Sequence, residues 1–525
     1  MKYLKPLRIA VSLILSFTIA FLFIDYYRYL PEFLRKISLY LQFIPSVAAF
    51  SVKASGAAAG FIVVIAATVI CGRLYCSFIC PLGFCQDIFI RSGRSSGLVK
   101  KRGYSRPHYV LFYTLLAASA LSCILSGTFF IRWLDPFSIF GRFMAFGISL
   151  PLIELNNGIA SVLVKNNNFS VSVLNIKPSV SGAIFAFSVF MLIMLPAIFH
   201  GRIYCNTICP AGALLSLISR LSFFNLAIDP SSCIKCGKCS SVCKSSCIDY
   251  AAGHIDTARC VSCFNCVSVC PEQSVRFARR KIQAAGSKRE RVINSDNTSA
   301  TITRSGFIAG LILLPNMVFS QGKQAGAIYR QDPAKQKKYS RKSYSSPPGS
   351  ISTDNFNSRC TACSLCITAC PTKVLQPAVL QYGLNGIMQP FMDFSSGFCN
   401  YDCTKCGEVC PAGAILETGI DAKRRIQTGK SVFVIENCIT YTNGTDCGAC
   451  SEHCPTKAVQ MVPFRNNLVI PEVNNAICTG CGACEYACPV RPLRAIYVEG
   501  NPVHKTAELP EVREVIKTTE PDFPF

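Results

Sequence analysis

Cysteine is the residue in this sequence best suited to chemistry, and 24 of its 32 cysteines fall into six groups of four. Four groups share one spacing, with two residues in each of the first two gaps and three in the last. Two groups widen only the first gap, to three and to eight residues. The regular groups are Cys233, Cys236, Cys239, Cys243; Cys260, Cys263, Cys266, Cys270; Cys360, Cys363, Cys366, Cys370; and Cys478, Cys481, Cys484, Cys488. The widened groups are Cys399, Cys403, Cys406, Cys410 and Cys438, Cys447, Cys450, Cys454.

This spacing is typical of bacterial [4Fe-4S] sites. Three close cysteines hold one cluster, and the fourth, usually followed by proline, reaches the neighbouring cluster. Thiolates suit iron because both are soft and each ligand charge offsets a ferric charge. Structural zinc sites use two separated cysteine pairs, and disulfides need no constant rhythm. The sequence therefore predicts six [4Fe-4S] clusters.

The exchange of fourth cysteines predicts which residues share a cluster. In the first two groups, Cys270 joins the first three cysteines and Cys243 joins the second three. The last four groups leave two arrangements open: first with second and third with fourth, or first with fourth and second with third. Lys244 stands where proline is usual, and the nearby Cys247 is either a competing ligand or a spare buried thiol.

A second cysteine pattern occurs twice at the ends of apolar runs. Residues 71–83 (CGRLYCSFICPLG) match residues 200–212 (HGRIYCNTICPAG). A cysteine pair spaced i, i+4 lies on one face of a helix, so two such faces could present four thiolates to each other. We expect a further metal or iron-sulfur centre, or a redox dithiol pair; the alternative is close helix packing with buried thiols. The four cysteines are Cys76, Cys80, Cys205 and Cys209.

Four apolar runs are long enough to cross a bilayer as helices, at about 20 residues each. They cover roughly 8–27, 54–71, 109–128 and 180–199. The loop 72–108 carries seven lysines and arginines against the single acid Asp87. The positive-inside rule places that loop in the cytoplasm, together with the groups at 233–270, and places the loops 28–53 and 129–179 outside.

A third feature separates the first two cysteine groups from the last four. Residues 306–319 form an apolar run, and residues 303–308 (TRSGFI) resemble a twin-arginine export signal that lacks its second arginine. We expect the chain to cross the membrane here through a fifth segment, which places the last four groups in the periplasm. The alternative is an interfacial or buried helix that leaves them in the cytoplasm.

Composition excludes other classes of protein. The formal charge of +24 counts cysteines as neutral. Six clusters of about −2 each would lower it to roughly +12, and the remaining positive charge lies mostly in loops beside apolar runs, which argues against nucleic acid as a partner. The sequence contains neither a phosphate-binding G-x-x-x-x-G-K-[ST] motif nor a convincing G-x-G-x-x-G, so a nicotinamide nucleotide is not the expected electron donor.

The expected fold is an α-helical membrane domain with four transmembrane helices and a fifth candidate segment, joined to α+β ferredoxin domains of the bacterial type. The expected boundaries are 1–199 for the membrane domain, 200–285 for a two-cluster ferredoxin, 286–355 for a linker with the signal-like segment, 356–505 for a four-cluster ferredoxin and 506–525 for a tail.

These motifs resemble a known pair of electron-transfer proteins. Residues 1–280, with the paired C-x3-C-P motifs and a two-cluster ferredoxin, resemble the NapH-type membrane ferredoxin of periplasmic nitrate reductase systems. Residues 300–500, with the signal-like segment, Pro347-Pro348-Gly349 and the four later groups, resemble the NapG/MauM-type exported ferredoxin. The chain thus looks like a fusion of the two.

The resemblance implies a protein of the bacterial cytoplasmic membrane that has quinol dehydrogenase activity. It would oxidise menaquinol or ubiquinol and relay electrons through [4Fe-4S] clusters to a periplasmic reductase or a cytochrome, with the quinone pool and membrane lipid as further partners. The alternative is a redox protein for the assembly of a metal centre, through copper reduction or maturation of a reductase or oxidase. No catalytic residue can be named from the sequence.

Overall fold

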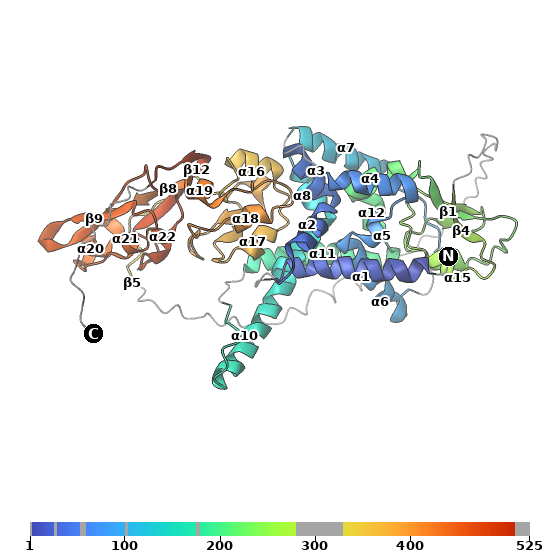
Figure 1. Ribbon diagram of the computed structural model, residues 1–525, viewed down its shortest axis with the longest axis horizontal. Coiled ribbons are helices and arrows are strands. Elements are labelled where there is room, and N and C mark those ends of the chain that lie inside the picture. Colours follow the sequence, from blue (N-terminus) through green and yellow to red (C-terminus); the bar gives the residue numbers. More distant parts are fainter. Residues whose placement is uncertain are drawn as a thin grey trace, which may run out of the picture.

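A computed structural model describes residues 3–25, 29–52, 59–99, 103–125, 127–174, 179–279 and 329–509. These residues form three parts. The helical part (residues 3–223) lies in the middle of an elongated molecule, the N-terminal ferredoxin module (224–279) lies at one end, and the C-terminal ferredoxin module (329–509) lies at the other (Figure 1). The signal-like run at 306–319 and most of the tail at 506–525 lie outside the described residues.

The helical part consists of apolar helices joined by short turns. It contains α1 (Leu4–Leu22), α2 (Glu32–Tyr40), α3 (Phe43–Val52), α4 (Gly60–Cys71), α5 (Tyr75–Phe78), α6 (Pro81–Ser95), α7 (Tyr109–Leu125), α8 (Phe129–Leu134), α9 (Pro136–Arg142), the π-helix η2 (Phe143–Ile148), α10 (Ser149–Lys165), α11 (Val180–His200), α12 (Ile203–Thr207) and α13 (Pro210–Ser219). Its core includes Ile19, Phe137, Phe190 and Leu215.

Three helices of the described part are long and apolar enough to cross a membrane: Leu4–Leu22, Pro136–Lys165 and Val180–His200. The first and last correspond to predicted spans. The runs at 54–71 and 109–128 give the shorter helices α4 and α7, so four spans are not confirmed. The helix at Pro136–Lys165 lies within 129–179, a segment that we expected to be an outside loop. Its apolar pattern is interrupted by the polar residues Glu154, Asn156 and Asn157.

The N-terminal ferredoxin module is a small α+β unit. Its elements are β1 (Phe224–Ile228), α14 (Lys238–Ser241), β2 (Ile248–Asp249), β3 (His254–Ile255), α15 (Asn265–Val269) and β4 (Val275–Arg279). The first strand pairs antiparallel with the last, Phe224 with Arg279 and Ile228 with Val275. The helices α12 and α13, expected within a ferredoxin that starts at residue 200, instead belong to the helical part, where Cys209 and Leu215 join its core.

The C-terminal ferredoxin module is also α+β, with short helices and two-stranded sheets. Its elements are β5 (Tyr329–Arg330), α16 (Thr353–Arg359), α17 (Leu365–Ala369), β6 (Leu375–Pro377), β7 (Pro390–Met392), α18 (Lys405–Glu408), α19 (Ile420–Arg424), β8 (Ile426–Phe433), α20 (Ile439–Asn443), α21 (Ala449–Glu452), β9 (Val459–Pro463), β10 (Val469–Val473), α22 (Ala483–Ala487), β11 (Val490–Arg491) and β12 (Ile496–Thr506). The longest pairing is antiparallel, between β8 and β12.

Residues 329–352 belong to this module, although the sequence suggested a linker up to 355. The strand β5 pairs in parallel with β11. Arg341 forms an ion pair with the buried carboxylate of Glu485, and Ser346 is hydrogen bonded to His504 at 2.9 Å. Lysine, serine and proline are common in linkers, but here hydrogen bonds to β11 and β12 order the segment.

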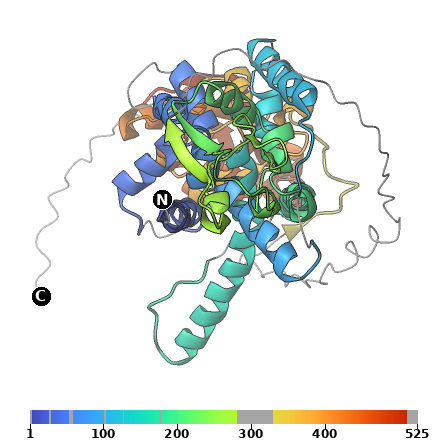
Figure 2. The ribbon, with the colours of Figure 1, turned by 90° about the vertical axis from the view of Figure 1, so that its right-hand side faces the viewer.

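The two ferredoxin modules contact opposite ends of the same helices. The N-terminal module lies at the start of α1 and α7 and at the end of α11, through Lys5–Ser268, Tyr109–Asp256 and Gly201–Lys244 contacts. The C-terminal module lies at the other ends, where Gly182 at the start of α11 faces Pro377 and Leu22 at the end of α1 lies near Leu365. Figure 2, viewed from the N-terminal module, shows that module covering the helix ends while α10 extends sideways.

Candidate iron-sulfur centres

The four regular cysteine groups share one backbone turn. A residue with positive φ directly precedes the second cysteine, and another directly precedes a short helix that contains the third. In the first group these are Lys235 (φ 53°) and Gly237 (φ 71°), and in the third they are Ala362 (φ 54°) and Ser364 (φ 68°). A left-handed residue other than glycine costs about 1–2 kcal/mol. Its recurrence therefore indicates that a tight cysteine loop is required.

In the N-terminal module, the cysteines gather in the exchanged arrangement. Cys233, Cys236, Cys239 and Cys270 line one small cavity. Cys243, Cys260, Cys263 and Cys266 line a second. Cys247 lines that second cavity too, and its sulfur lies 3.5 Å from the sulfur of Cys243. It is thus a buried fifth thiol beside the four expected ligands.

In the C-terminal module, adjacent groups exchange their fourth cysteines. Cys410 is an electrostatic neighbour of Cys360, Cys363 and Cys366, while Cys370 shares a cavity with Cys399, Cys403 and Cys406. Likewise Cys488 neighbours Cys447 and Cys450, and Cys454 neighbours Cys481 and Cys484. Of the two arrangements left open by the sequence, the structure favours first with second and third with fourth.

The two pairs of C-terminal sites are joined directly. The backbone N–H of Cys399 donates to the carbonyl oxygen of Cys481 at 2.9 Å, and the two thiols are electrostatic neighbours. The second site of the module therefore adjoins the site formed by Cys454, Cys478, Cys481 and Cys484. Electrons could pass between the pairs without leaving the module.

The C-x3-C-P repeat brings its four cysteines together inside the helical part. All four are buried, and each of the six pairs that they form interacts electrostatically. Their local geometry differs from the expected single helical face. The helix α5 ends at Phe78, and Cys80 is extended (φ −67°, ψ 115°), because the following Pro81 excludes the helical conformation at the residue before it. Cys209 repeats this geometry (φ −65°, ψ 117°).

Two arginines brace the halves of the repeat against each other. Arg73 of the first half donates to the carbonyl oxygen of Cys205 at 2.8 Å, and Arg202 of the second half donates to that of Cys76. Glycine is needed where these groups meet. A Cβ on Gly83 would lie 2.4 Å from the Cys76 carbonyl oxygen, and one on Gly212 would lie 2.4 Å from that of Cys205. The repeat therefore forms a pseudo-symmetric four-cysteine centre.

This four-cysteine centre lies between the two ferredoxin modules. Towards the N-terminal module, Arg202 is an electrostatic neighbour of both Cys205 and Cys263. Towards the C-terminal module, the Tyr204 hydroxyl donates to the carbonyl oxygen of Leu134 at 2.6 Å, and the adjacent Asp135 is a neighbour of Cys363. Seven cysteine sites thus form one continuous row from the first module to the last.

Charged groups attach each module to the helical part. Asp87, buried on α6, forms ion pairs with Arg8 at 2.8 Å, Arg202 at 2.8 Å and Lys244 at 2.6 Å. Burial alone would raise the pKa of Asp87, but the three cations outweigh it and hold that pKa well below its usual range. Lys244, which stands where proline is usual, therefore joins the N-terminal module to α6.

At the opposite interface, Arg132 of α8 donates to the backbone of the C-terminal module. Its Nε bonds to the carbonyl oxygen of Cys360 at 3.1 Å, and its Nη2 bonds to that of Asn357 at 2.7 Å. Asp135 accepts from the Ser138 backbone N–H at 2.9 Å and caps α9. The first cluster loop of the C-terminal module is therefore fixed against the helical part.

Among the described residues, no three His, Cys, Asp or Glu side chains approach closely enough to bind a single metal ion. This holds equally for the six ferredoxin groups.

Comparisons with known proteins agree with this chemistry. The family described as "4Fe-4S binding domain" matches residues 56–102 and 183–227, which contain both halves of the repeat. The family described as "4Fe-4S dicluster domain" matches residues 443–491 in the C-terminal module. No solved structure matches the chain.

Among curated relatives, the ferredoxin-type protein NapG of Escherichia coli is 34% identical over 145 residues, which is 26% of this chain and 61% of NapG. The methylamine utilization ferredoxin-type protein MauM of Methylorubrum extorquens is 36% identical over 144 residues, 26% of this chain and 63% of MauM. The chain thus spans about three fifths of the length of these relatives. The predicted resemblance is confirmed for this segment: the chain is an iron-sulfur electron-transfer protein related to the NapG and MauM ferredoxins.

Proposed function

We propose that this protein is anchored in the cytoplasmic membrane of a bacterium, oxidises quinol, and passes the electrons through [4Fe-4S] clusters to a reductase or cytochrome in the periplasm. The observation that carries the proposal is the row of seven cysteine sites, which runs through the apolar helical part. The row ends in a ferredoxin module on each side of that part (Figure 1). Clusters move single electrons, and a row of them conducts electrons between distant partners.

The distribution of charge supports a cytoplasmic position for the N-terminal module. Arg94, in the basic loop after the first repeat, donates to the carbonyl oxygen of Ser241, and Arg259 of the module donates to that of Ser105. The basic loop and the module therefore share one end of the helices, the end that the positive-inside rule assigns to the cytoplasm. The C-terminal module, at the other end, would then lie in the periplasm.

The four-cysteine centre is proposed to hold a seventh cluster. Buried thiols with no disulfide partner, mutual electrostatic contact and a match to a 4Fe-4S binding family support it. Purified protein should then contain about 28 irons per chain, and the Cys76→Ser/Cys205→Ser variant should contain about 24. Equal iron in the two proteins would contradict a cluster at the repeat and leave the six ferredoxin sites intact.

The function itself is tested with the full-length protein in lipid nanodiscs. Menaquinol added without oxygen should reduce the clusters, seen as reduced-cluster signals in electron paramagnetic resonance spectra. Reduction with dithionite measures the total number of clusters that can be reduced. If dithionite reduces the clusters while neither menaquinol nor ubiquinol does, quinol oxidation is wrong. If a strain that lacks this protein then also contains a periplasmic enzyme without its metal, the result would favour the alternative function in metal-centre assembly.

A further inference from the structure

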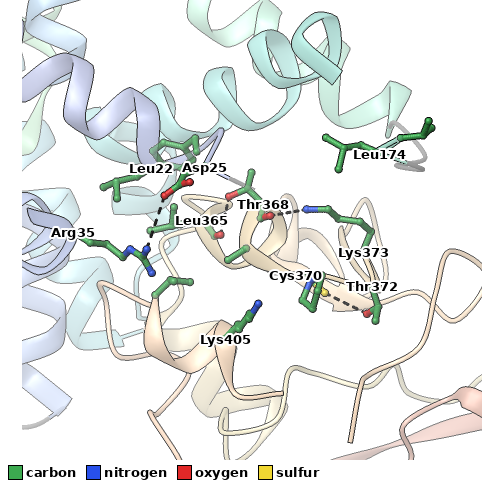
Figure 3. Close-up of a pocket in the computed structure, with 15 residues that line it drawn as sticks. Leu22, Asp25, Arg35, Leu174, Leu365, Thr368, Cys370, Thr372, Lys373 and Lys405 are labelled. Carbon is green, nitrogen blue, oxygen red and sulfur yellow. Dashed lines mark hydrogen bonds and ion pairs between the residues drawn. The ribbon is translucent and has the colours of Figure 1, made fainter. Parts of the chain in front are cut away.

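A cavity of about 370 Å³ lies where the helical part meets the C-terminal module. One wall is the end of α1, with Leu22 and Asp25, joined by Arg35 of α2. The opposite wall is the start of the C-terminal module, around Thr368 and Cys370. Figure 3 shows Asp25, Arg35, Lys373 and Lys405 around this space, with Leu174 at one side.

This cavity does not have the lining of a cluster site. Cys370 is the single cysteine among its described lining residues, whereas each ferredoxin cavity is lined by four or more. Cys370, Pro371 and Thr372 line both this space and the neighbouring cluster cavity. A molecule bound here would therefore lie against a cluster ligand, separated from the cluster only by the Cys370 loop.

The lining combines apolar and charged groups as a quinol requires. The carboxylate of Asp25 is almost completely buried, accepts two backbone N–H bonds at 2.8 and 3.0 Å, and lies 4.0 Å from Arg35. Leu22 and Leu365 supply apolar walls. Exposed apolar side chains then continue along α1 away from the cavity, at Phe21, Phe17 and Ile14. Small-molecule sites have this mixture of apolar walls and a few fixed polar groups.

We propose that this cavity binds the quinol, with the ring against the Cys370 loop, the isoprenoid tail along the exposed face of α1, and Asp25 as the first proton acceptor. This inference rests on the proposed quinol oxidation and adds its location. Both O–H bonds of the hydroquinone break and two carbonyls form. The two electrons would pass singly to oxidised clusters, beginning with the cluster that Cys370 would hold. One proton goes to Asp25, and the other goes to water at the outer surface.

Lys373 and Lys405 add positive charge at the cavity beyond the Arg35–Asp25 ion pair, and this charge favours a ligand with negatively charged oxygen. An anionic lipid head group would also satisfy these cations, but the apolar walls at Leu22 and Leu365 and the loop shared with the neighbouring cysteine cavity favour a redox-active ring. Nanodiscs made with and without phosphatidylglycerol separate the two ligands.

The location is tested by photolabelling the full-length protein with an azido-quinone in phosphatidylcholine nanodiscs. Mass spectrometry should find the label on peptides that contain 22–35 or 365–373. The Leu174→Trp substitution fills the cavity from a loop and should reduce the label at least tenfold. The control Leu155→Trp places a tryptophan at an exposed position of α10. The amount of label in this variant should stay within twofold of that in the unaltered protein. Label confined to other helices, or removed by phosphatidylglycerol alone, would overturn the site.

A second measurement separates failure of the site from failure of the function. With the cavity beside the C-terminal module, menaquinol should still reduce the C-terminal clusters in a Cys80→Ser/Cys209→Ser variant, while reduction of the N-terminal module should slow at least tenfold. If quinol reduces the N-terminal module at the normal rate and the C-terminal clusters slowly, the site is wrong and quinol oxidation stands. If quinol reduces neither module even in the unaltered protein, the function is wrong.

Discussion

The docking of the N-terminal ferredoxin module depends on one carboxylate, and Asp87→Asn tests that dependence. The substitution keeps the size of the side chain and removes its charge. Arg8, Arg202 and Lys244 would then share a buried site without a counter-ion. Since Arg8 comes from α1, Arg202 from the second repeat and Lys244 from the module, the substitution weakens three connections at once.

The expected loss follows from the burial of the site. The Asp87 side chain is 9% exposed and that of Arg202 is fully buried. Removing one partner of a buried ion pair costs about 3–5 kcal/mol. At about 1.4 kcal/mol per factor of ten, the population with an undocked module should rise by about 10²–10⁴. Removing Lys244 as well, in an Asp87→Asn/Lys244→Met protein, takes away one uncompensated cation and should recover part of the loss.

Hydrogen exchange measured by mass spectrometry in nanodiscs gives the assay. The amides of Arg202 and Ser105 donate across this interface, to the carbonyl oxygens of Lys244 and Ser246, so they should lose protection most. Glu32→Gln is the matched control, since the Glu32–Lys36 pair is 2.6 Å long but about 70% exposed on both sides and should change nothing measurable. Exchange at 202 and 105 within twofold of the unaltered protein would refute the reasoning.

Three other variants test the remaining contacts. A methyl group on Gly141 would lie 2.4 Å from the Cys363 carbonyl oxygen, so Gly141→Ala should expose the 360–366 loop to protease, whereas Gly158→Ala, with open space around it, should not. Arg142 is buried and an electrostatic neighbour of Cys363, so Arg142→Met should lower the reduction potential of that cluster in a redox titration; an unchanged or higher potential would contradict this. Burial lowers the pKa of His504 to about 4, below the unfolded value of about 6.5. Its neutral form therefore stabilises the folded C-terminal module above pH 6.5, and this stability is lost as the pH falls towards 4. We expect about 1 kcal/mol less stability at pH 5.5 than at pH 7.5, and a smaller pH dependence in His504→Gln when urea unfolding of the holoprotein is compared.

Cysteine spacing predicted the iron-sulfur chemistry because the tight turn around a cluster constrains the chain locally. The positive φ angles at Lys235 and Ala362 show that constraint in the backbone. The meeting of Cys76, Cys80, Cys205 and Cys209 could also be anticipated, since a repeated motif implies related halves. The expected single helical face does not bring them together, because Pro81 and Pro210 end the helix before the second cysteine of each pair.

Other features depend on contacts between distant segments and leave no local signal. Pairing of the last four cysteine groups is decided by the packing of the loops, which brings Cys410 beside Cys360 and Cys370 beside Cys399, and spacing does not encode it. In the sequence, Asp87 is the single acid of a basic loop. Its role depends on ion pairs with residues of α1, the second half of the repeat and the N-terminal module, which are distant from it in the sequence. The cavity near Asp25 and Cys370 combines residues from 22 to 409, so no sequence window contains it.

The row of cysteine sites that joins the two ends of the molecule also has an electrical consequence. With the helical part in a bilayer, each electron that travels from the C-terminal module to the N-terminal module moves one negative charge across the membrane. The free energy of this transfer changes by about 2.3 kcal/mol per 100 mV of membrane potential. The equilibrium constant for electron transfer between the two modules then changes by about fifty-fold. If the N-terminal module lies in the cytoplasm, as proposed, a negative cell interior opposes electron flow towards it. The redox state of the N-terminal clusters would then report the size of the membrane potential.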